Sequence, residues 1–97
     1  MLHIINQSPF RNNTLKTVLR FLKPSDPVLF YEDGVYTLAA KGAHADTVKK
    51  IMKTNPVYGL GPDIKARGIN EVVADVKLVD YEGFVDLVEE HQVNSWL

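Results

Sequence analysis

The clearest fold signal in the sequence is the segment Val57-Tyr58-Gly59-Leu60-Gly61-Pro62-Asp63-Ile64-Lys65-Ala66-Arg67-Gly68. Its first part, residues 57–60, is a short apolar run that is typical of a buried strand. Its second part has the pattern of a brief helix, with Pro62 at the first helical position and Gly68 just past the end. A strand that leads directly into a helix is the repeating unit of α/β proteins.

Three other apolar runs extend this pattern, over residues 2–5, 28–31 and 76–79. The runs are nearly continuous rather than alternating, as expected for parallel strands that are covered on both faces. We therefore predict a three-layer α/β/α sandwich around a mostly parallel sheet of four to five strands, with right-handed crossovers.

The segments between these runs carry helical patterns. An apolar stripe at i, i+3, i+4 and i+7 predicts a helix that Pro24 should end. The stripe consists of Leu15, Val18, Leu19 and Leu22, and its N-cap could be Asn12, Asn13 or Thr14. A second helix is expected to begin at the N-cap Asp33 and to end at Gly42 in a left-handed conformation. A third helix is expected over residues 45–52.

The last helix has the clearest signals. Asp80 is the expected N-cap, and an apolar stripe follows it. The stripe consists of Phe84, Leu87, Val88 and His91. The opposite face of the helix is acidic and consists of Glu82, Asp86, Glu89 and Glu90. His91 is expected to end the helix, where a cation suits the dipole.

The composition, 45% apolar and 24% charged, is that of an ordinary globular protein. We expect one domain spanning residues 1–97, small enough to leave apolar surface for a partner to cover. The sequence has no basic N-terminal region before a long apolar run and no apolar stretch of about 20 residues, so we expect a cytoplasmic protein. The absence of cysteine excludes disulfides, Cys-type zinc sites and a thiol nucleophile.

Charge is unevenly distributed along the chain. Residues 1–53 contain eight Lys/Arg and four Asp/Glu, whereas residues 54–97 contain three and eight. The basic stripe of Lys16, Arg20 and Lys23, with Arg11, could contact phosphates. Because the net charge is −1 and few aromatic residues lie nearby, a solvated helix face is the simpler interpretation.

Several familiar site patterns are incomplete. Gly59-Leu60-Gly61 begins like a dinucleotide fingerprint, but the third glycine would fall at Ile64, and no Walker-type run is present. The three histidines (His3, His44 and His91) lie far apart in sequence, so we expect no metal site, and His3 should form a local hydrogen bond in the first strand. We expect no bound cofactor.

Hydrolytic and acid/base sites also lack support. Ser8, Ser25 and Ser95 have no nucleophile setting and are interpreted as turn or cap residues. Asp33, Asp63 and Asp80 could meet at the carboxyl edge of the sheet and do acid/base work. Each also precedes or opens a helix, so helix capping is the simpler explanation.

Five segments, taken in order, resemble the TusB/DsrH family. They are Met1-Leu2-His3 with Ser8-Pro9-Phe10, Asp33-Gly34-Val35-Tyr36, Val57-Tyr58, Gly61-Pro62-Asp63-Ile64-Lys65-Ala66-Arg67-Gly68, and Val79-Asp80-Tyr81-Glu82-Gly83-Phe84-Val85-Asp86-Leu87. The likeness covers nearly the whole chain and ends in Ser95-Trp96. It implies a DsrE-like fold, and it singles out as motif or loop residues Asp33, Gly34, Asp63, Arg67, Asp80 and Tyr81.

The resemblance also implies a role as the smallest subunit of a heterohexameric sulfur relay, built from two copies each of three related chains. Its partners would be DsrE/TusD-like and DsrF/TusC-like siblings, and sulfur would be held on a cysteine of the larger sibling. The TusBCD branch passes persulfide sulfur toward 2-thiouridine at the tRNA wobble position, and the DsrEFH branch serves dissimilatory sulfur oxidation. DsrH-type members often carry a cysteine in the first helix, where this chain has Val18, which favours a TusB-like role without excluding the other branch.

The leading hypothesis is thus a noncatalytic subunit of a sulfurtransferase complex that positions a cysteine-bearing sibling. We expect the isolated chain to self-associate through its uncovered face, with no membrane and no direct nucleic-acid partner. The alternatives are a small-ligand or anion-binding domain and, third, an enzyme acting through the aspartates. Trp96 should be packed, either against its own core or at a subunit interface.

Overall fold

A parallel sheet forms the centre of the protein. In the computed structural model, which describes residues 1–11 and 13–97, the sheet has five strands in the order β4-β3-β2-β1-β5. The strands are β1 (Leu2–Ile5), β2 (Val28–Phe30), β3 (Val57–Leu60), β4 (Lys77–Val79) and β5 (Val93–Trp96). Neighbouring strands pair in parallel throughout, as the continuous apolar runs predict.

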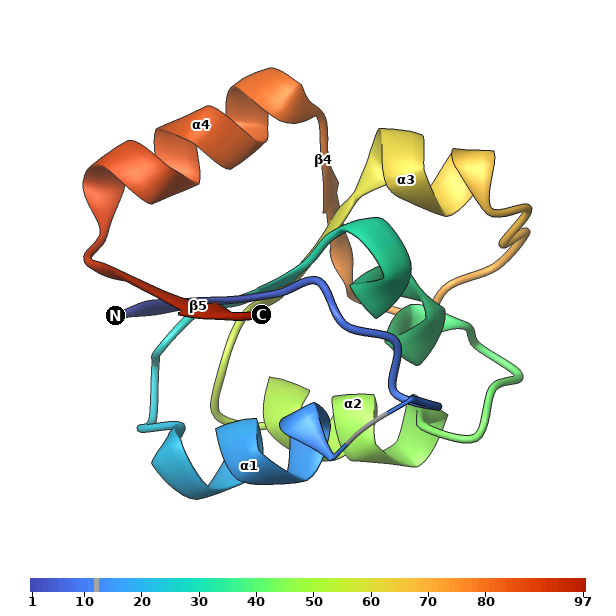
Figure 1. Ribbon diagram of the computed structural model, residues 1–97, viewed down its shortest axis with the longest axis horizontal. Coiled ribbons are helices and arrows are strands. Elements are labelled where there is room, and N and C mark those ends of the chain that lie inside the picture. The colour runs from blue at the N-terminus through green and yellow to red at the C-terminus, as the bar shows by residue number, and fades with distance from the viewer. Residues whose placement is uncertain (12) are drawn as a thin grey trace.

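Helices connect the strands and cover both faces of the sheet (Figure 1). They are α1 (Thr14–Phe21), the 3₁₀-helix η1 (Glu32–Leu38), α2 (Ala45–Met52), α3 (Gly61–Ala66) and α4 (Tyr81–Glu90). In Figure 1, α1 and α2 lie below the strands, and α4 lies above them. The expected three-layer sandwich is confirmed.

Each face of the sheet has its own hydrophobic cluster. The larger cluster packs residues of α1, η1, α2 and α3 against the sheet, with Val18 and Phe30 completely buried. The smaller cluster has a buried base of Leu2, Ile4 and Leu29 under Phe84, Leu87 and Val88 of α4. Ile4 and Ile5 fall in different clusters because successive side chains of a strand point to opposite faces.

Most of the expected elements are confirmed. The four apolar runs form strands, and the structure adds β5 at the edge beside β1. Helices α1 and α2 lie where the patterns place them, α3 has proline in its first turn, and Gly68 beyond it has a left-handed φ of 69°. Asp80 caps α4 by accepting a hydrogen bond from the Gly83 backbone N–H at 2.8 Å, and His91 is the C-cap.

The segment from Asp33 to Gly42 differs from the expected α-helix. It forms a 3₁₀-helix that ends at Leu38, because Ala39 and the residues after it pair with another segment. Ala39 bridges Val72 in antiparallel fashion, and the Ala40 N–H donates to the carbonyl of Glu71 at 2.9 Å. Gly42 is not among the described residues with a left-handed φ, so the prediction of a left-handed cap there is wrong.

The N-cap of the first helix is one of the three residues expected there, whereas the N-cap expected for the second helix is wrong. The N-cap of α1 is Asn13, which forms no side-chain capping bond, and Asn12 lies outside the described residues. The N-cap of η1 is Tyr31 rather than Asp33, which lies in the first turn. No helix within the described ranges is both long and apolar enough to cross a membrane.

Candidate functional site

One guanidinium and two carboxylates meet just beyond the carboxyl ends of β2 and β3. Arg67 Nε donates to Asp33 Oδ1 at 2.9 Å, and Arg67 Nη1 lies 3.8 Å from Asp63 Oδ1. The other oxygen of Asp63 accepts the backbone N–H of Glu32 at 2.6 Å. Arg67 and Asp63 therefore tie α3 to the start of η1.

The same cluster fixes a strained backbone. Glu32 has a φ of 47°, a left-handed conformation that is uncommon for a residue with a side chain. The Asp63 carboxylate that accepts its N–H is only 16% exposed, whereas that of Asp33 is 50% exposed. Asp63, the more buried carboxylate, thus stabilises the turn after β2, and Asp33 faces solvent.

These contacts correct the capping interpretation for two of the three aspartates. Asp33 accepts a hydrogen bond from Arg67, and Asp63 lies near Arg67 and accepts the backbone N–H of Glu32 in η1. Neither N-cap position of these two helices is held by a side-chain capping bond. Asp80 is a helix cap, as predicted, and it accepts the backbone N–H of Gly83 in α4. The expected convergence of carboxylates therefore brings together Asp33 and Asp63, with Arg67 between them.

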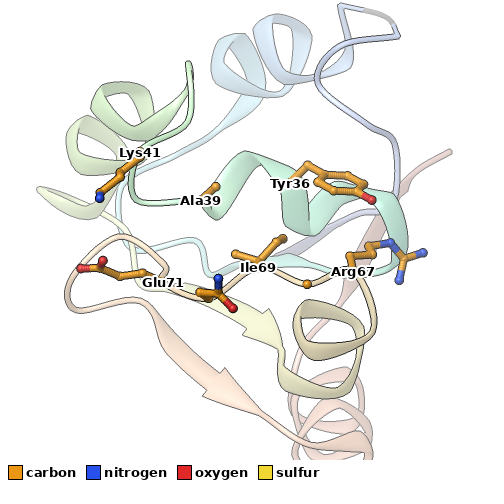
Figure 2. A pocket seen from close by; sticks show the side chains of 8 residues that line it. Tyr36, Ala39, Lys41, Arg67, Ile69 and Glu71 are labelled. Atoms are coloured by element: carbon orange, nitrogen blue, oxygen red, sulfur yellow. The ribbon is translucent and has the colours of Figure 1, made fainter.

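A groove of about 440 Å³ opens beside Arg67, between η1 and the segment that follows α3. It is lined by Tyr36, Ala39, Lys41, Arg67, Gly68, Ile69, Asn70 and Glu71. In Figure 2, Tyr36 and Ile69 face each other across the groove, Lys41 and Glu71 lie at one end, and Arg67 lies at the other. Its size falls in the range of small-molecule sites, about 300–1,000 Å³.

Gly34 and Tyr81, the other two motif residues, have distinct surroundings. A Cβ at Gly34 would overlap the backbone carbonyl of Ile5, so only glycine lets η1 approach β1 this closely. Tyr81 opens α4 with 62% of its surface exposed. Gly34 therefore acts in packing, and Tyr81 is available at the surface.

A second polar group, which the sequence patterns did not reveal, joins the two ends of the chain. Trp96 Nε1 donates to Nδ1 of His3 at 3.1 Å, and His3 Nε2 lies 3.2 Å from Asp26 Oδ2. Since Nδ1 accepts, the proton of neutral His3 is assigned to Nε2, which donates to Asp26. The N-terminal ammonium of Met1 also donates to Asp26, at 3.2 Å.

This arrangement perturbs Asp26 and holds Trp96. Burial alone would raise the pKa of Asp26, but hydrogen bonds from His3, the N-terminal ammonium and the Lys23 N–H outweigh it and hold the pKa below 3.8. The indole also stacks near His3, with ring centroids 6.2 Å apart, and contacts Phe21 at 5.8 Å. The prediction that Trp96 is packed is confirmed. His3 is hydrogen-bonded, but its partners Asp26 and Trp96 are remote in sequence, so the expected local bond is wrong.

Among the described residues, no three histidine, cysteine, aspartate or glutamate side chains gather into a set that could hold a metal ion. His44 and His91 lie at a helix start and a helix end, apart from the His3 group. The sequence contains no thiol. The Arg67 cluster and the His3 group can therefore position backbone segments, and the Arg67 cluster also presents Arg67 and Asp33 to solvent.

Comparison with known proteins agrees with this architecture. Residues 7–94 match the family described as "DsrH like protein". The chain is 36% identical over 99 residues to Protein TusB of Pectobacterium parmentieri, covering 99% of this chain and all of the relative. It is 30% identical over 92 residues to Protein TusB of Escherichia coli K12, covering 94% of each chain.

Solved structures share the fold. The crystal structure of the ychN protein from E. coli superposes with a TM-score of 0.82 at 13% identity, covering 97% of each chain. The solution structure of Tm0979 from Thermotoga maritima superposes with a TM-score of 0.60 at 25% identity, covering 95% of each chain. On the family match and the full-length sequence identity, this chain belongs to the TusB/DsrH family.

Proposed function

We propose that this chain is a noncatalytic subunit of a sulfur-relay complex, in which it positions a cysteine-bearing sibling of related fold. The observation that carries the proposal is a family membership over the whole chain combined with a sequence that contains no cysteine. A sulfur relay needs a thiolate nucleophile, and the thioethers of Met1 and Met52 cannot form a persulfide. The sulfur must therefore be carried by another chain.

The partners in this proposal are DsrE/TusD-like and DsrF/TusC-like siblings in a heterohexamer in the cytoplasm. The complex would serve 2-thiouridine synthesis at the tRNA wobble position, because the relatives at 30–36% identity are TusB proteins. A DsrEFH-type complex for sulfur oxidation is the alternative within the family. A sulfite reductase gene beside two DsrE-like reading frames would favour that alternative.

The surface of the chain supports a role in assembly. Large apolar side chains remain exposed in the described residues, at Phe10, Phe21, Leu78, Tyr81, Val85 and Leu97, each more than half exposed. A domain of this size cannot cover all its apolar surface by itself. We propose that siblings cover part of this surface, and that Trp96 and the loop residues Asp33, Asp63, Arg67 and Tyr81 lie at or near the contacts.

The test is sulfur loading in the presence and absence of this subunit. In the loading step, a sibling thiolate attacks the outer sulfur of a persulfide donor, the donor S–S bond breaks, a new S–S bond forms on the sibling, and the donor thiolate leaves. Intact-mass spectrometry should show added sulfur on the sibling and none on this chain. Omitting this chain should lower sulfur delivery, because the sibling loses the interface that holds its loop.

Two results would contradict the proposal in different ways. Sulfur stably attached to this chain would refute the chemical argument. Undiminished sulfur delivery without this chain would refute the structural argument.

The groove beside Arg67 favours a second candidate function, the binding of a small ligand or anion. Its volume suits a small molecule, and the aromatic wall of Tyr36 and the cations Lys41 and Arg67 would contact it. Under this alternative, inorganic phosphate or sulfate raises the melting temperature of the chain, and Lys41→Ala removes the effect. An unchanged melting temperature with both anions would leave the assembly role as the better explanation.

A further inference from the structure

The two sides of the protein expose opposite charges. The side formed by α1, α2 and the turns after them exposes the cations Lys16, Arg20, Lys23, Lys49, Lys50 and Lys53, together with one acid, Asp46. The outer side of α4 exposes the acids Glu82, Asp86, Glu89 and Glu90. Across residues 1–11 and 13–97, none of these side chains forms an ion pair within the chain. Figure 1 shows these helices on opposite sides of the strands.

Helices α1 and α2 lie side by side and form a furrow between them. Residues of both helices line a small cavity of about 130 Å³, including Leu19 of α1 and Thr47 of α2. At the other end, the Asn55 side chain joins the turns that follow the two helices, donating to the Lys23 carbonyl at 2.7 Å and the Asp26 carbonyl at 2.9 Å. The furrow is therefore a fixed feature of the fold.

The furrow is lined partly by apolar side chains, and basic side chains lie along one rim. Leu19, 41% exposed, lines the cavity. Phe10, 67% exposed, lies nearby, with its ring 5.6 Å from that of the lining residue His44. Helical spacing places Lys16 and Arg20 on one rim, beside Leu19, and Lys50 on the outer face of α2. Such a surface suits a helix with an apolar stripe bordered by acids.

Helix α4 has that composition on its solvent side. Tyr81 and Val85 are one turn apart and are 62% and 52% exposed. Because Phe84, Leu87 and Val88 face the sheet, Glu82, Asp86 and Glu89 point outward beside this apolar pair. The outer side of α4 and the furrow are thus complementary in both charge and polarity.

We propose that, when the siblings are absent, a second copy of this chain docks the outer side of its α4 into the furrow between α1 and α2. A nucleic acid fits the observations less well, because the chain has a net charge of −1 and the furrow offers apolar side chains between its cations. Because the outer side of α4 and the furrow lie on opposite sides of the protein, each copy contacts one neighbour through α4 and another through the furrow. Such a contact is heterologous and gives rows or rings rather than a closed pair.

The first test is the mass of the full-length chain by light scattering, over a range of concentrations and at two salt levels. The weight-average mass should rise with concentration at about 0.01 M ionic strength and return toward the 10.9 kDa monomer at about 1 M, where the screening length falls to about 3 Å. A mass that stays at the monomer value at both salt levels would overturn the proposal.

Charge reversal then locates the contact. The furrow variant carries Lys16→Glu and Arg20→Glu, and the helix variant carries Asp86→Lys and Glu89→Lys. A control variant carries Lys65→Glu and Lys77→Glu, which changes net charge by the same amount at residues of α3 and β4, outside the furrow and outside α4. Circular dichroism and thermal melting establish that each variant is folded.

The furrow and helix variants should each lose self-association by about tenfold or more, while the control keeps most of it. Mixed together, the two surface variants should associate, because acids then face bases again. Amide NMR shifts in that mixture should fall on α1, α2 and α4. Equal losses in all three variants, or shifts elsewhere, would refute the assigned surfaces.

Binding of a short single-stranded RNA tests whether the basic side contacts a nucleic acid rather than a second copy of the chain. If the chain binds this RNA through α1 and α2 while remaining monomeric, the basic side is a nucleic-acid surface and the docking proposal is wrong. This test does not depend on the proposed sulfur-relay role, because it uses the isolated chain and measures no sulfur transfer.

Discussion

Replacing Gly34 with alanine tests how η1 is held against β1. A Cβ at this position would overlap the carbonyl oxygen of Ile5 and lie 3.0 Å from its carbonyl carbon and 3.4 Å from the Asn6 Cα. All three neighbours are backbone atoms of β1 and the residue after it, so no side chain can rotate away. The alanine variant must therefore shift η1 as a unit.

The expected cost follows from that shift. Carbon atoms pack best at separations of about 3.5–4.0 Å, so η1 would have to move by about 1 Å. Because Val35 and Leu38 anchor η1 in the larger core, the movement also disturbs their packing. Overpacking of this kind costs about 1–3 kcal/mol, and the rigid neighbours place Gly34→Ala at the upper end. For a domain of this size, such a loss corresponds to a fall in melting temperature of about 10–20 °C.

The assay is thermal and urea unfolding followed by circular dichroism, with Gly61→Ala as the matched control. At Gly61 an added Cβ meets only the Val79 carbonyl oxygen at 3.4 Å, an ordinary contact, so stability should change by less than about 1 kcal/mol. NMR shifts of Asp33 and Arg67 should change in Gly34→Ala, because the cluster moves with η1. If the two variants melt within a few degrees of each other, the close approach is not rigid and the reasoning fails.

Three further predictions concern hydrogen bonds that the structure defines. Trp96→Phe leaves His3 Nδ1 without its donor and should lower the free energy of unfolding by about 1–3 kcal/mol in urea titrations; an unchanged midpoint would contradict the bond. The pKa of Asp26 is lowered in the folded state, so its stabilising contribution is present above pH 3.8 and is lost as the pH falls through the lower folded value. Urea midpoints from about pH 5 to about pH 2 should therefore fall more steeply in the wild type than in Asp26→Asn, and parallel curves would rule this out. Asp80→Ala removes the cap bond to Gly83 and should cost about 0.5–2 kcal/mol, whereas Asp80→Ser should retain most of the stability, and equal losses in both would show that capping is not the cause.

The chain order of strands and helices could be predicted because those signals are local. Continuous apolar runs mark buried parallel strands, and Pro62, Gly68 and Asp80 mark helix ends through their own backbone and side-chain chemistry. The sequence also settles a chemical point, since a chain without cysteine cannot hold sulfur as a persulfide. These conclusions need only the period of a segment or the identity of a residue.

Strand β5 and the irregular helix could not be predicted from local patterns. The sequence of β5, Val93-Asn94-Ser95-Trp96, has two polar residues and no fully buried residue, so it lacks an apolar run. The 3₁₀ form of η1 depends on the pairing of Ala39 with Val72, which is far along the chain. In both cases the partner that fixes the backbone is remote in sequence.

The pairing of the polar side chains depends on how the strands are ordered in the sheet. Arg67 lies 34 residues from Asp33, and Trp96 lies 93 residues from His3. The order β4-β3-β2-β1-β5 brings the carboxyl ends of β2 and β3 together and places the last strand beside the first. A residue type can favour a cap or a pair, but its partner is set by strand order, which is decided by the packing of the whole core.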